Sequence, residues 1–245
     1  MNDKLQQIDT LLGELNQYRA NENYRITGAL EIEYTYDSNR IEGNTLTLHE
    51  TDMVVNKGIT IAGKGLREHL EAINHKEAID FIKDIAQKKE PISERVLLDI
   101  HAIVLHSINK DNAGKYRRVP VIISGSKHIP PQPYLLQPKM DELFQWYEAN
   151  KDSMHPVVLA AQMHEKLVSV HPFIDGNGRT ARLLMNLILM QHGYPIANIK
   201  GDNETRRRYY ETLEEASSGD NSAFVEFIED VVIQSLTYYL KIIRG

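Results

Sequence analysis

One stretch of the sequence, HPFIDGNGRTAR at 171–182, gathers the residues best suited to chemistry. His171 opens it, Asp175 follows, and Arg179 and Arg182 come after a Gly-Asn-Gly turn. An imidazole can take a proton from an attacking hydroxyl, and a carboxylate is a ligand that Mg²⁺ uses together with phosphate oxygens. Arginines clamp phosphate groups. These residue types at this spacing indicate a site for phosphoryl or nucleotidyl transfer.

The turn formed by Gly176, Asn177 and Gly178 comes directly before an apolar segment that we predict to be a helix at 177–191. Glycines let several backbone N–H groups converge on one anion at the positive end of a helix. The two arginines lie three apart in the first turns of this helix, so they share a face. Positive side chains oppose the helix dipole there, and a bound phosphate would offset that cost.

The composition excludes several other classes of function. The chain has 245 residues, a formal net charge of -6 and no cysteine. This balance builds no basic face for nucleic acid, and the lack of cysteine excludes disulfides and thiolate metal sites. The first residues carry no secretory signal, and no apolar run approaches the roughly 18 residues of a membrane helix. We therefore expect a cytoplasmic protein that binds neither nucleic acid nor membrane.

The 171–182 stretch resembles the signature of Fic-domain proteins, HPFx[DE]GNGRxxR, at every specified position. The resemblance implies transfer of AMP from ATP to a Ser, Thr or Tyr hydroxyl of a protein (AMPylation), with ATP as the substrate and Mg²⁺ as the cofactor. It implies that His171 is the general base, Asp175 the Mg²⁺ ligand and the glycine turn the phosphate cradle. It also implies that Arg179 and Arg182 contact the β- and γ-phosphates.

The resemblance covers roughly residues 25–243 and implies an all-α fold, a Fic-type helical bundle with a small β-hairpin flap and an N-terminal helical extension. We expect an N-terminal helical region at 1–60 and a core domain at 61–245, together one compact unit. Helical periodicity and capping signals agree. The remaining helices are predicted at about 26–38, from 47, 66–85, from 93, from 156, 203–217 and 222–243.

The segment VPVIISGSKHIPPQP at 119–133 interrupts the helical pattern. Its β-branched residues, followed by glycine and then prolines, predict a short β-hairpin with an irregular exit. It resembles the family's flap, whose exposed strand edge pairs with the backbone of the target protein. The flap residues that the resemblance assigns to target binding are Val121, Ile122, Ile123, Gly125 and His128.

The segment that begins at Arg208 resembles a helix that lines the nucleotide-base pocket of the family. The resemblance places Tyr209 and Tyr210 at the adenine, where they would stack or form hydrogen bonds. Ser217 stands where many family members have asparagine. This departure leaves the nucleotide preference open.

The residues SNRIEGN at 38–44 resemble the family's inhibitory motif, [ST]xxxE[GN]. Ser38 and Glu42 fill its specified positions, which implies the subgroup with an N-terminal inhibitory helix. Glu42 is expected to pair with Arg182 through a short, charge-assisted hydrogen bond. While the pair persists, Arg182 is occupied and ATP is held out of line for attack. A misplacement of about 1 Å can cost on the order of 100-fold in rate.

The sequence leaves alternatives to AMP transfer open. The same site could remove AMP from a modified protein, with Glu42 orienting a water, or transfer another nucleotide or a phosphate. A third reading is a non-catalytic module that senses nucleotides, although a pure binder needs no base such as His171. The partner is a protein that presents a hydroxyl side chain, and its identity does not follow from the sequence. Self-modification and a homodimer also stay open.

Overall fold

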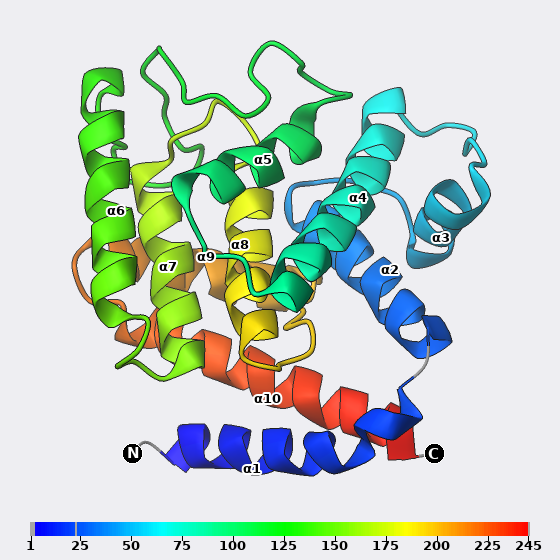
Figure 1. Ribbon diagram of the computed structural model, residues 1–245. Coiled ribbons are helices and arrows are strands. Elements are labelled where there is room, and N and C mark those ends of the chain that lie inside the picture. Colours follow the sequence, from blue (N-terminus) through cyan, green and yellow to red (C-terminus); the bar gives the residue numbers. More distant parts are fainter. Residues whose placement is uncertain (1–2, 23, 245) are drawn as a thin grey trace.

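A computed structural model describes residues 3–22 and 24–244 (Figure 1). Within these residues the chain forms helices and irregular segments, with no β-strand, and none of the helices is both long and apolar enough to cross a membrane. The predicted all-α fold is therefore confirmed. The helices are α1 Asp3–Tyr18, η1 Arg19–Asn21, α2 Tyr24–Ile41, α3 Leu48–Lys57, α4 Leu66–Lys88, α5 Glu94–Leu105, η2 Pro133–Leu135, α6 Leu136–Asn150, α7 Pro156–Val170, α8 Asn177–Gln191, α9 Asn203–Ser217 and α10 Ser222–Arg244.

Helix α8 lies at the centre of the bundle and packs against α7, α4 and α5. Almost its whole surface is buried, including both arginines of the 171–182 stretch. The second half of α8, at 183–190, is apolar except for Asn186, and a helical segment that is apolar on all sides belongs in the interior. The helix begins and ends where we predicted. Only residues 171–176 separate its N-terminus from the end of α7, so the two helix ends lie close together.

The N-terminal helices cover the bundle from two sides. Helix α1 lies along α10, whereas α2 packs on α4 and α8 (Figure 1). Helix α3 begins after Thr47, which forms the predicted capping box with Glu50, and packs on α2 and α4. The division into a region at 1–60 and a core at 61–245 stays a prediction. Helix α2 matters most for the site, because it brings Ser38, and Glu42 in the turn directly after the helix, to the N-terminus of α8.

The β-hairpin predicted at 119–133 is wrong, because no part of this segment is a strand. A side chain takes the place of the expected ladder. Arg117 donates hydrogen bonds to the carbonyl groups of Val119 (3.0 Å) and Pro131 (2.6 Å), and so joins the two arms of the segment. The prolines remove N–H groups that a ladder would need. The segment is an irregular loop held by long-range contacts.

Candidate active site

His171 is placed by the end of α7. The helix stops there because His171 adopts a left-handed conformation, with φ 48° and ψ 57°, and its N–H donates to the carbonyl of Leu167 (3.0 Å). A positive φ is uncommon for a residue other than glycine and persists only where the surroundings hold it. His171 therefore lies in the turn after a helix. The turn reverses the direction of the chain, which then continues to the N-terminus of α8.

Asn177 holds the loop between the two helices. Its buried amide accepts a hydrogen bond from the N–H of Phe173 (3.0 Å) and donates one to the carbonyl of the same residue (2.8 Å). Gly176 precedes it with φ 80°, a conformation that glycine adopts without strain. The predicted phosphate cradle is thus a real turn at a helix N-terminus. The Asn177 side chain, however, is fully engaged in shaping it.

His101, from α5, supports the same loop from below. Its ring stacks on Phe173 at a centroid distance of 3.6 Å, and its Nε2 lies 3.0 Å from the carbonyl oxygen of Asp175. Its Nδ1 accepts a hydrogen bond from the N–H of Gly114 (3.0 Å). Burial lowers the pKa of His101 to about 4, so the ring is neutral at physiological pH. The sequence analysis missed this residue.

Arg117 ties the catalytic turn to the 119–133 loop. Its Nε donates to the carbonyl of His171 (2.9 Å), and its backbone N–H donates to the carbonyl of Pro172 (2.9 Å). The same guanidinium binds both arms of the loop. One buried side chain therefore sets the position of the histidine relative to the expected target-binding segment, a role that the sequence analysis did not assign.

The electrostatic surroundings of His171 keep its imidazole neutral. Burial is the main cause, and the nearby positive charge of Arg117 adds to it, so the pKa of His171 falls to about 4. A neutral imidazole can accept a proton at physiological pH. The side chain is therefore in the protonation state that a general base needs.

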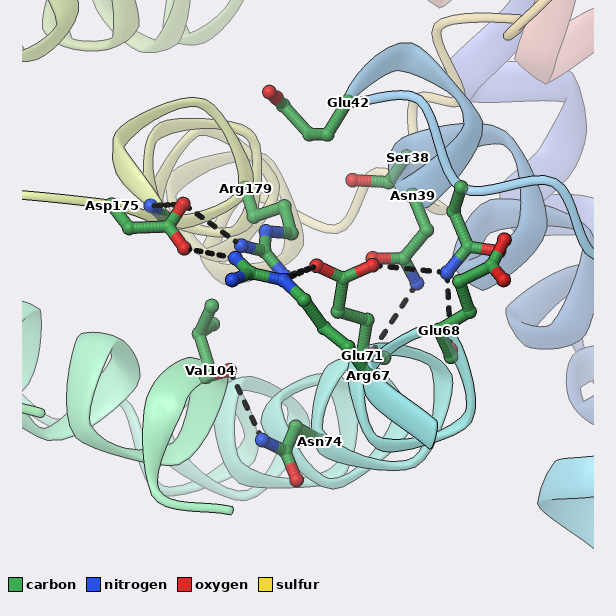
Figure 2. A network of polar contacts seen from close by, with 12 residues as sticks. Ser38, Asn39, Glu42, Arg67, Glu68, Glu71, Asn74, Val104, Asp175 and Arg179 are labelled. Carbon is green, nitrogen blue, oxygen red and sulfur yellow. Dashed lines mark hydrogen bonds and ion pairs between the residues drawn. The ribbon is translucent and has the colours of Figure 1, made fainter. Parts of the chain in front are cut away.

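Asp175 faces two guanidinium groups (Figure 2). One carboxylate oxygen accepts from the N–H of Gly176 (2.6 Å) and from Arg179 (3.2 Å), and the other pairs with Arg67. Glu71 pairs with both arginines from the opposite side. Burial by itself would raise the pKa of Asp175, but the two arginines and the backbone N–H outweigh it and lower the pKa.

These surroundings fit a metal only together with phosphates. Within the described part of the chain, no three acidic or histidine side chains gather as ligands for a bare metal ion. Mg²⁺ needs one or two carboxylates when substrate phosphates and water supply the other ligands. The ionised, partly exposed Asp175 meets that need, provided that the exposed Arg67 releases its oxygen.

Arg182 is 1% exposed, and all three nitrogens of its guanidinium donate hydrogen bonds. It donates to the hydroxyl (3.0 Å) and the carbonyl (2.9 Å) of Ser38, to the carboxylate of Glu42 (2.7 Å) and to the hydroxyl of Tyr209 (3.3 Å). Burial opposes the positive charge, but attraction to Glu42 outweighs it and raises the pKa of Arg182. The predicted Glu42–Arg182 pair is confirmed, whereas Arg179 points away from it, toward α4.

Glu42 also lies against the first turn of α8. A Cβ added to Gly178 would clash with the Oε1 atom of Glu42 and approach the guanidinium of Arg182 to 3.0 Å. Glycine at this position therefore lets the carboxylate reach the N-terminal end of the helix, where the dipole and the free N–H groups favour an anion. Glu42 lies at the very end of the helix where phosphate binding was predicted.

The two tyrosines of α9 have different surroundings. Tyr209 is 1% exposed and packs among Phe224, Phe227 and His164, so its ring is not available to a nucleotide. This side of α9 faces the core, and the contact of Tyr209 with adenine stays a prediction. Tyr210 is 43% exposed, and its hydroxyl donates to the carbonyl of Ile41 (3.1 Å).

The 119–133 loop presents its apolar residues to solvent. Ile122 is 90% exposed, and Val119 and Ile129 are also exposed. The loop is tethered to α9, since Glu214 accepts a hydrogen bond from the N–H of Lys127 (2.8 Å) and a short one from Ser126. His128 fixes the base of the loop, because its Nε2 lies 2.7 Å from the carbonyl oxygen of Ser169. Hydrogen bonds to the rest of the protein thus hold the loop in place, while its apolar side chains face solvent.

The chain resembles known proteins over most of its length. Residues 91–189 match the Fic/DOC family. Protein adenylyltransferase Fic of Nematostella vectensis is 39% identical over 211 residues, which are 85% of this chain and 48% of that protein. Protein adenylyltransferase Fic of Culex quinquefasciatus is 40% identical over 211 residues, 85% of this chain and 41% of that protein. The chain thus spans about half the length of these relatives.

Solved structures share the fold. Fic-1 from C. elegans superposes with a TM-score of 0.86 at 32% identity, over 97% of this chain and 71% of that one. A Fic domain containing signaling protein from Bacteroides thetaiotaomicron gives a TM-score of 0.88 at 29% identity, over 99% and 97% of the two chains. The helical bundle, with its histidine turn before a buried, arginine-bearing helix, is that of a Fic domain. The chain belongs to the Fic/DOC family.

The clamp formed by Asn177 leads to a prediction about stability. Asn177→Ala leaves a buried N–H and a buried carbonyl of Phe173 without partners, so we expect the free energy of unfolding in urea to fall by roughly 2–3 kcal/mol. Asn56→Ala removes an amide on the exposed face of α3 and should change the free energy by less than about 0.5 kcal/mol. Equal values for the two variants would show that the clamp does not hold the loop.

Proposed function

We propose that this chain is a Mg²⁺-dependent protein adenylyltransferase that transfers AMP from ATP to a Ser, Thr or Tyr hydroxyl and restrains itself through Glu42. The observation that carries the proposal is one arrangement around the N-terminus of α8. A neutral His171 and an ionised Asp175 lie beside an anion-binding helix end, and the buried Arg182 at that end is held by a carboxylate. The names of the two relatives support it.

The chemistry is an in-line displacement at the α-phosphorus of ATP. The target hydroxyl oxygen forms a bond to that phosphorus, and the bond from phosphorus to the pyrophosphate oxygen breaks. The hydroxyl proton passes to the imidazole of His171. Bound Mg²⁺ supplies positive charge that neutralises the phosphates. The backbone of Gly176 to Gly178 and the side chain of Arg182 hold the phosphates of ATP, and Asp175 holds the ion that accompanies them.

Self-restraint follows from competition for one anion site. Glu42 places a carboxylate at the N-terminus of α8 and takes a guanidinium nitrogen of Arg182. A triphosphate brings its own negative charge to the same place, so the two anions exclude each other electrostatically. ATP must then bind in a shifted pose or wait for Glu42 to leave. Until Glu42 leaves, the α-phosphorus is not in line for attack at His171.

The residues expected around the nucleotide base support the choice of ATP less directly than the residues around the phosphates support a nucleotide. Tyr210 offers an exposed ring next to the site, whereas Ser217 uses its hydroxyl to donate to the carbonyl of Glu214 (2.7 Å). ATP is proposed because the relatives are named adenylyltransferases. A panel of radiolabelled ATP, GTP, CTP and UTP with the Glu42→Gly variant tests this preference. Transfer of a different nucleotide with higher kcat/KM would replace ATP in the proposal.

Removal of AMP from a modified protein is the second candidate function. Within the described residues, Glu42 forms its hydrogen bond through Oε1 only, and its side chain is one-third exposed. Its other oxygen is free to orient a water that attacks phosphorus, which would break the bond to the protein oxygen and release AMP. Incubating an AMP-labelled protein with wild type and with Glu42→Gly separates the two. Glu42→Gly would accelerate transfer but abolish removal.

Removal of the Glu42 carboxylate should release the restraint on transfer. Glu42→Gly should raise transfer of labelled AMP to protein by 10-fold or more, on the order of the cost of a misaligned phosphate, because Arg182 becomes available to ATP. The assay is incorporation from α-³²P-ATP into lysate protein and into the chain itself, followed by mass spectrometry of the products. The double variant Glu42→Gly with His171→Ala is the control and should transfer nothing while it still binds Mg-ATP. No gain in the single variant contradicts the restraint.

A second prediction follows from the lowered pKa of His171. The neutral imidazole is the active form, so activity is lost only as the pH falls through the pKa of about 4. We expect kcat/KM of Glu42→Gly to stay level from about pH 8 to about pH 5.5, because the free enzyme's pKa values set this profile. Removal of the Glu42 charge shifts the pKa further down, in the same direction. A loss of activity centred near the ordinary histidine pKa of roughly 6.5 would show an exposed base.

A third prediction tests the exposed loop as the target-binding segment. In the Glu42→Gly background, Ile122→Asp should lower labelling of lysate proteins about 10-fold or more, because a charge replaces an apolar contact at an interface. The affinity for Mg-ATP, measured by calorimetry, should stay unchanged. Tyr24→Asp is the control, since Tyr24 is 78% exposed and lies at the N-terminal end of α2, the opposite end from Glu42. Equal loss in both variants would contradict a role of the loop in target binding.

A further inference from the structure

A second cavity, separate from the catalytic turn, lies between the N-terminal half of α2 and the core. Its volume is about 390 Å³, and its walls come from α2, α4, α10 and the segment that follows α8. This volume is within the range of roughly 300–1,000 Å³ that is typical of small-molecule sites. The walls bring together residues that are far apart in the sequence. Helix α2, on one side of the cavity, is the helix that directly precedes Glu42.

The charged residues of this cavity cancel one another. Its lining holds three cations and three carboxylates, and each is engaged in an ion pair. Arg19 pairs with Glu22 (3.0 Å), Lys83 pairs with Glu31, and Lys200 pairs with Glu33 (3.3 Å). A charged ligand would have to break one of these pairs. The cavity therefore favours an uncharged molecule.

The floor of the cavity is apolar and aromatic. Tyr194 and Tyr239 are buried in it, and Met190 and Ile196 complete the surface. Flat aromatic molecules pack well against such rings. The amide oxygen of Asn198, which also lines the cavity, is buried and has no hydrogen-bond donor within the described residues. An uncharged aromatic molecule would pack against the tyrosine rings, and one N–H or O–H group on it would donate to the amide oxygen of Asn198.

Asn198 connects the cavity wall to the inhibitory helix. Its Nδ2 donates to the buried carboxylate of Asp37 on α2 (2.7 Å), which also accepts from the N–H of Gly201 (2.9 Å) and pairs with Lys200 (3.2 Å). A Cβ added to Gly201 would approach the backbone oxygen of Asp37 to 2.9 Å, so the two segments are in close contact. Asp37 lies one residue before Ser38. The cavity wall and the Arg182 contact are therefore parts of one docking surface for α2.

We propose that this cavity binds a small uncharged aromatic molecule and that its occupation fastens α2 to the core. The ligand would bridge Leu30 on α2 and the floor around Met190, and it would leave when α2 moves away. By linkage, a molecule that binds only the docked state stabilises that state. The consequence for activity rests on the proposed function, since docked α2 is the state in which Glu42 restrains transfer.

Binding is tested with Nile red, an uncharged aromatic dye that fluoresces in apolar surroundings. Nile red has no N–H or O–H group, so it tests the apolar floor of the cavity and not the contact with Asn198. We expect saturable 1:1 binding to the wild-type chain, and at least 10-fold weaker binding of anilinonaphthalene sulfonate, which carries a negative charge. Ala86→Phe places a ring into the cavity and should abolish Nile red binding. Ala149→Phe, on the exposed face of α6, is the matched control and should bind as wild type does. Binding that survives Ala86→Phe overturns the site.

Coupling to α2 is tested by amide hydrogen exchange. If α2 must undock for its amides to exchange, a dye concentration of ten times Kd should slow exchange of residues 37–41 by about tenfold. These residues do not line the cavity, so direct shielding does not explain such an effect. Exchange in α6 should stay unchanged, and Ala86→Phe should show no effect in either helix. Dye binding without slower exchange at 37–41 overturns the coupling.

The activity measurement separates this inference from the proposed function. Nile red should lower the residual transfer of wild type and leave Glu42→Gly unaffected, because its α2 carries no restraining carboxylate. If Glu42→Gly shows no transfer at all, the proposed function fails, while dye binding and hydrogen exchange still decide the cavity. If Glu42→Gly transfers AMP and Nile red lowers its rate to the same extent as that of wild type, the dye acts elsewhere and the inference fails.

Discussion

The buried guanidinium of Arg182 is the constraint on which the arrangement of the site depends. A fully desolvated arginine does not lose its proton, so it needs hydrogen-bond acceptors and a negative charge nearby. Ser38 and Tyr209 supply neutral oxygens, and Glu42 supplies the charge. Removing Glu42 leaves a strong, preformed binding site for another anion. Arg182, which would bind a phosphate of ATP, therefore needs the carboxylate of Glu42 as its counter-charge when no phosphate is bound.

Helix α2 is docked by both polar and apolar contacts. Its buried residues include the polar Glu31, Thr35, Asp37, Ser38 and Asn39 and the apolar Ile32, Tyr34 and Ile41. Undocking would return the polar groups to water, which satisfies them, whereas exposure of the apolar side chains opposes it. Only roughly 2.7 kcal/mol separates a helix that is docked 99% of the time from one that is docked half the time. Small changes at this interface, whether in sequence or by a ligand, therefore have large effects on the restrained population.

How far the sequence predicted the structure depended on the range of the interactions. Local signals located α8 and α9 to the residue, since caps and periodicity act within a few positions. The Glu42–Arg182 contact was predicted through a family motif. His101 could not be recognised, because a lone histidine in an apolar stripe carries no local sign of its partners. The burial of Tyr209 was missed, although its spacing from the buried Thr212 and Ala216 marks the core face of α9.

The absence of the hairpin changes which backbone groups of the 119–133 segment are free. A two-stranded hairpin offers only the outer edge of each strand, because the inner edges are used by its own ladder. In the loop at 119–133, the inner bonds are made by the side chains of Arg117 and Glu214 instead. Within the described residues, the backbones of Val121 and Ile122 form no hydrogen bonds with the protein. Their N–H and carbonyl groups are therefore open to an added strand, held at a fixed height above His171 by the same arginine that shapes the catalytic turn.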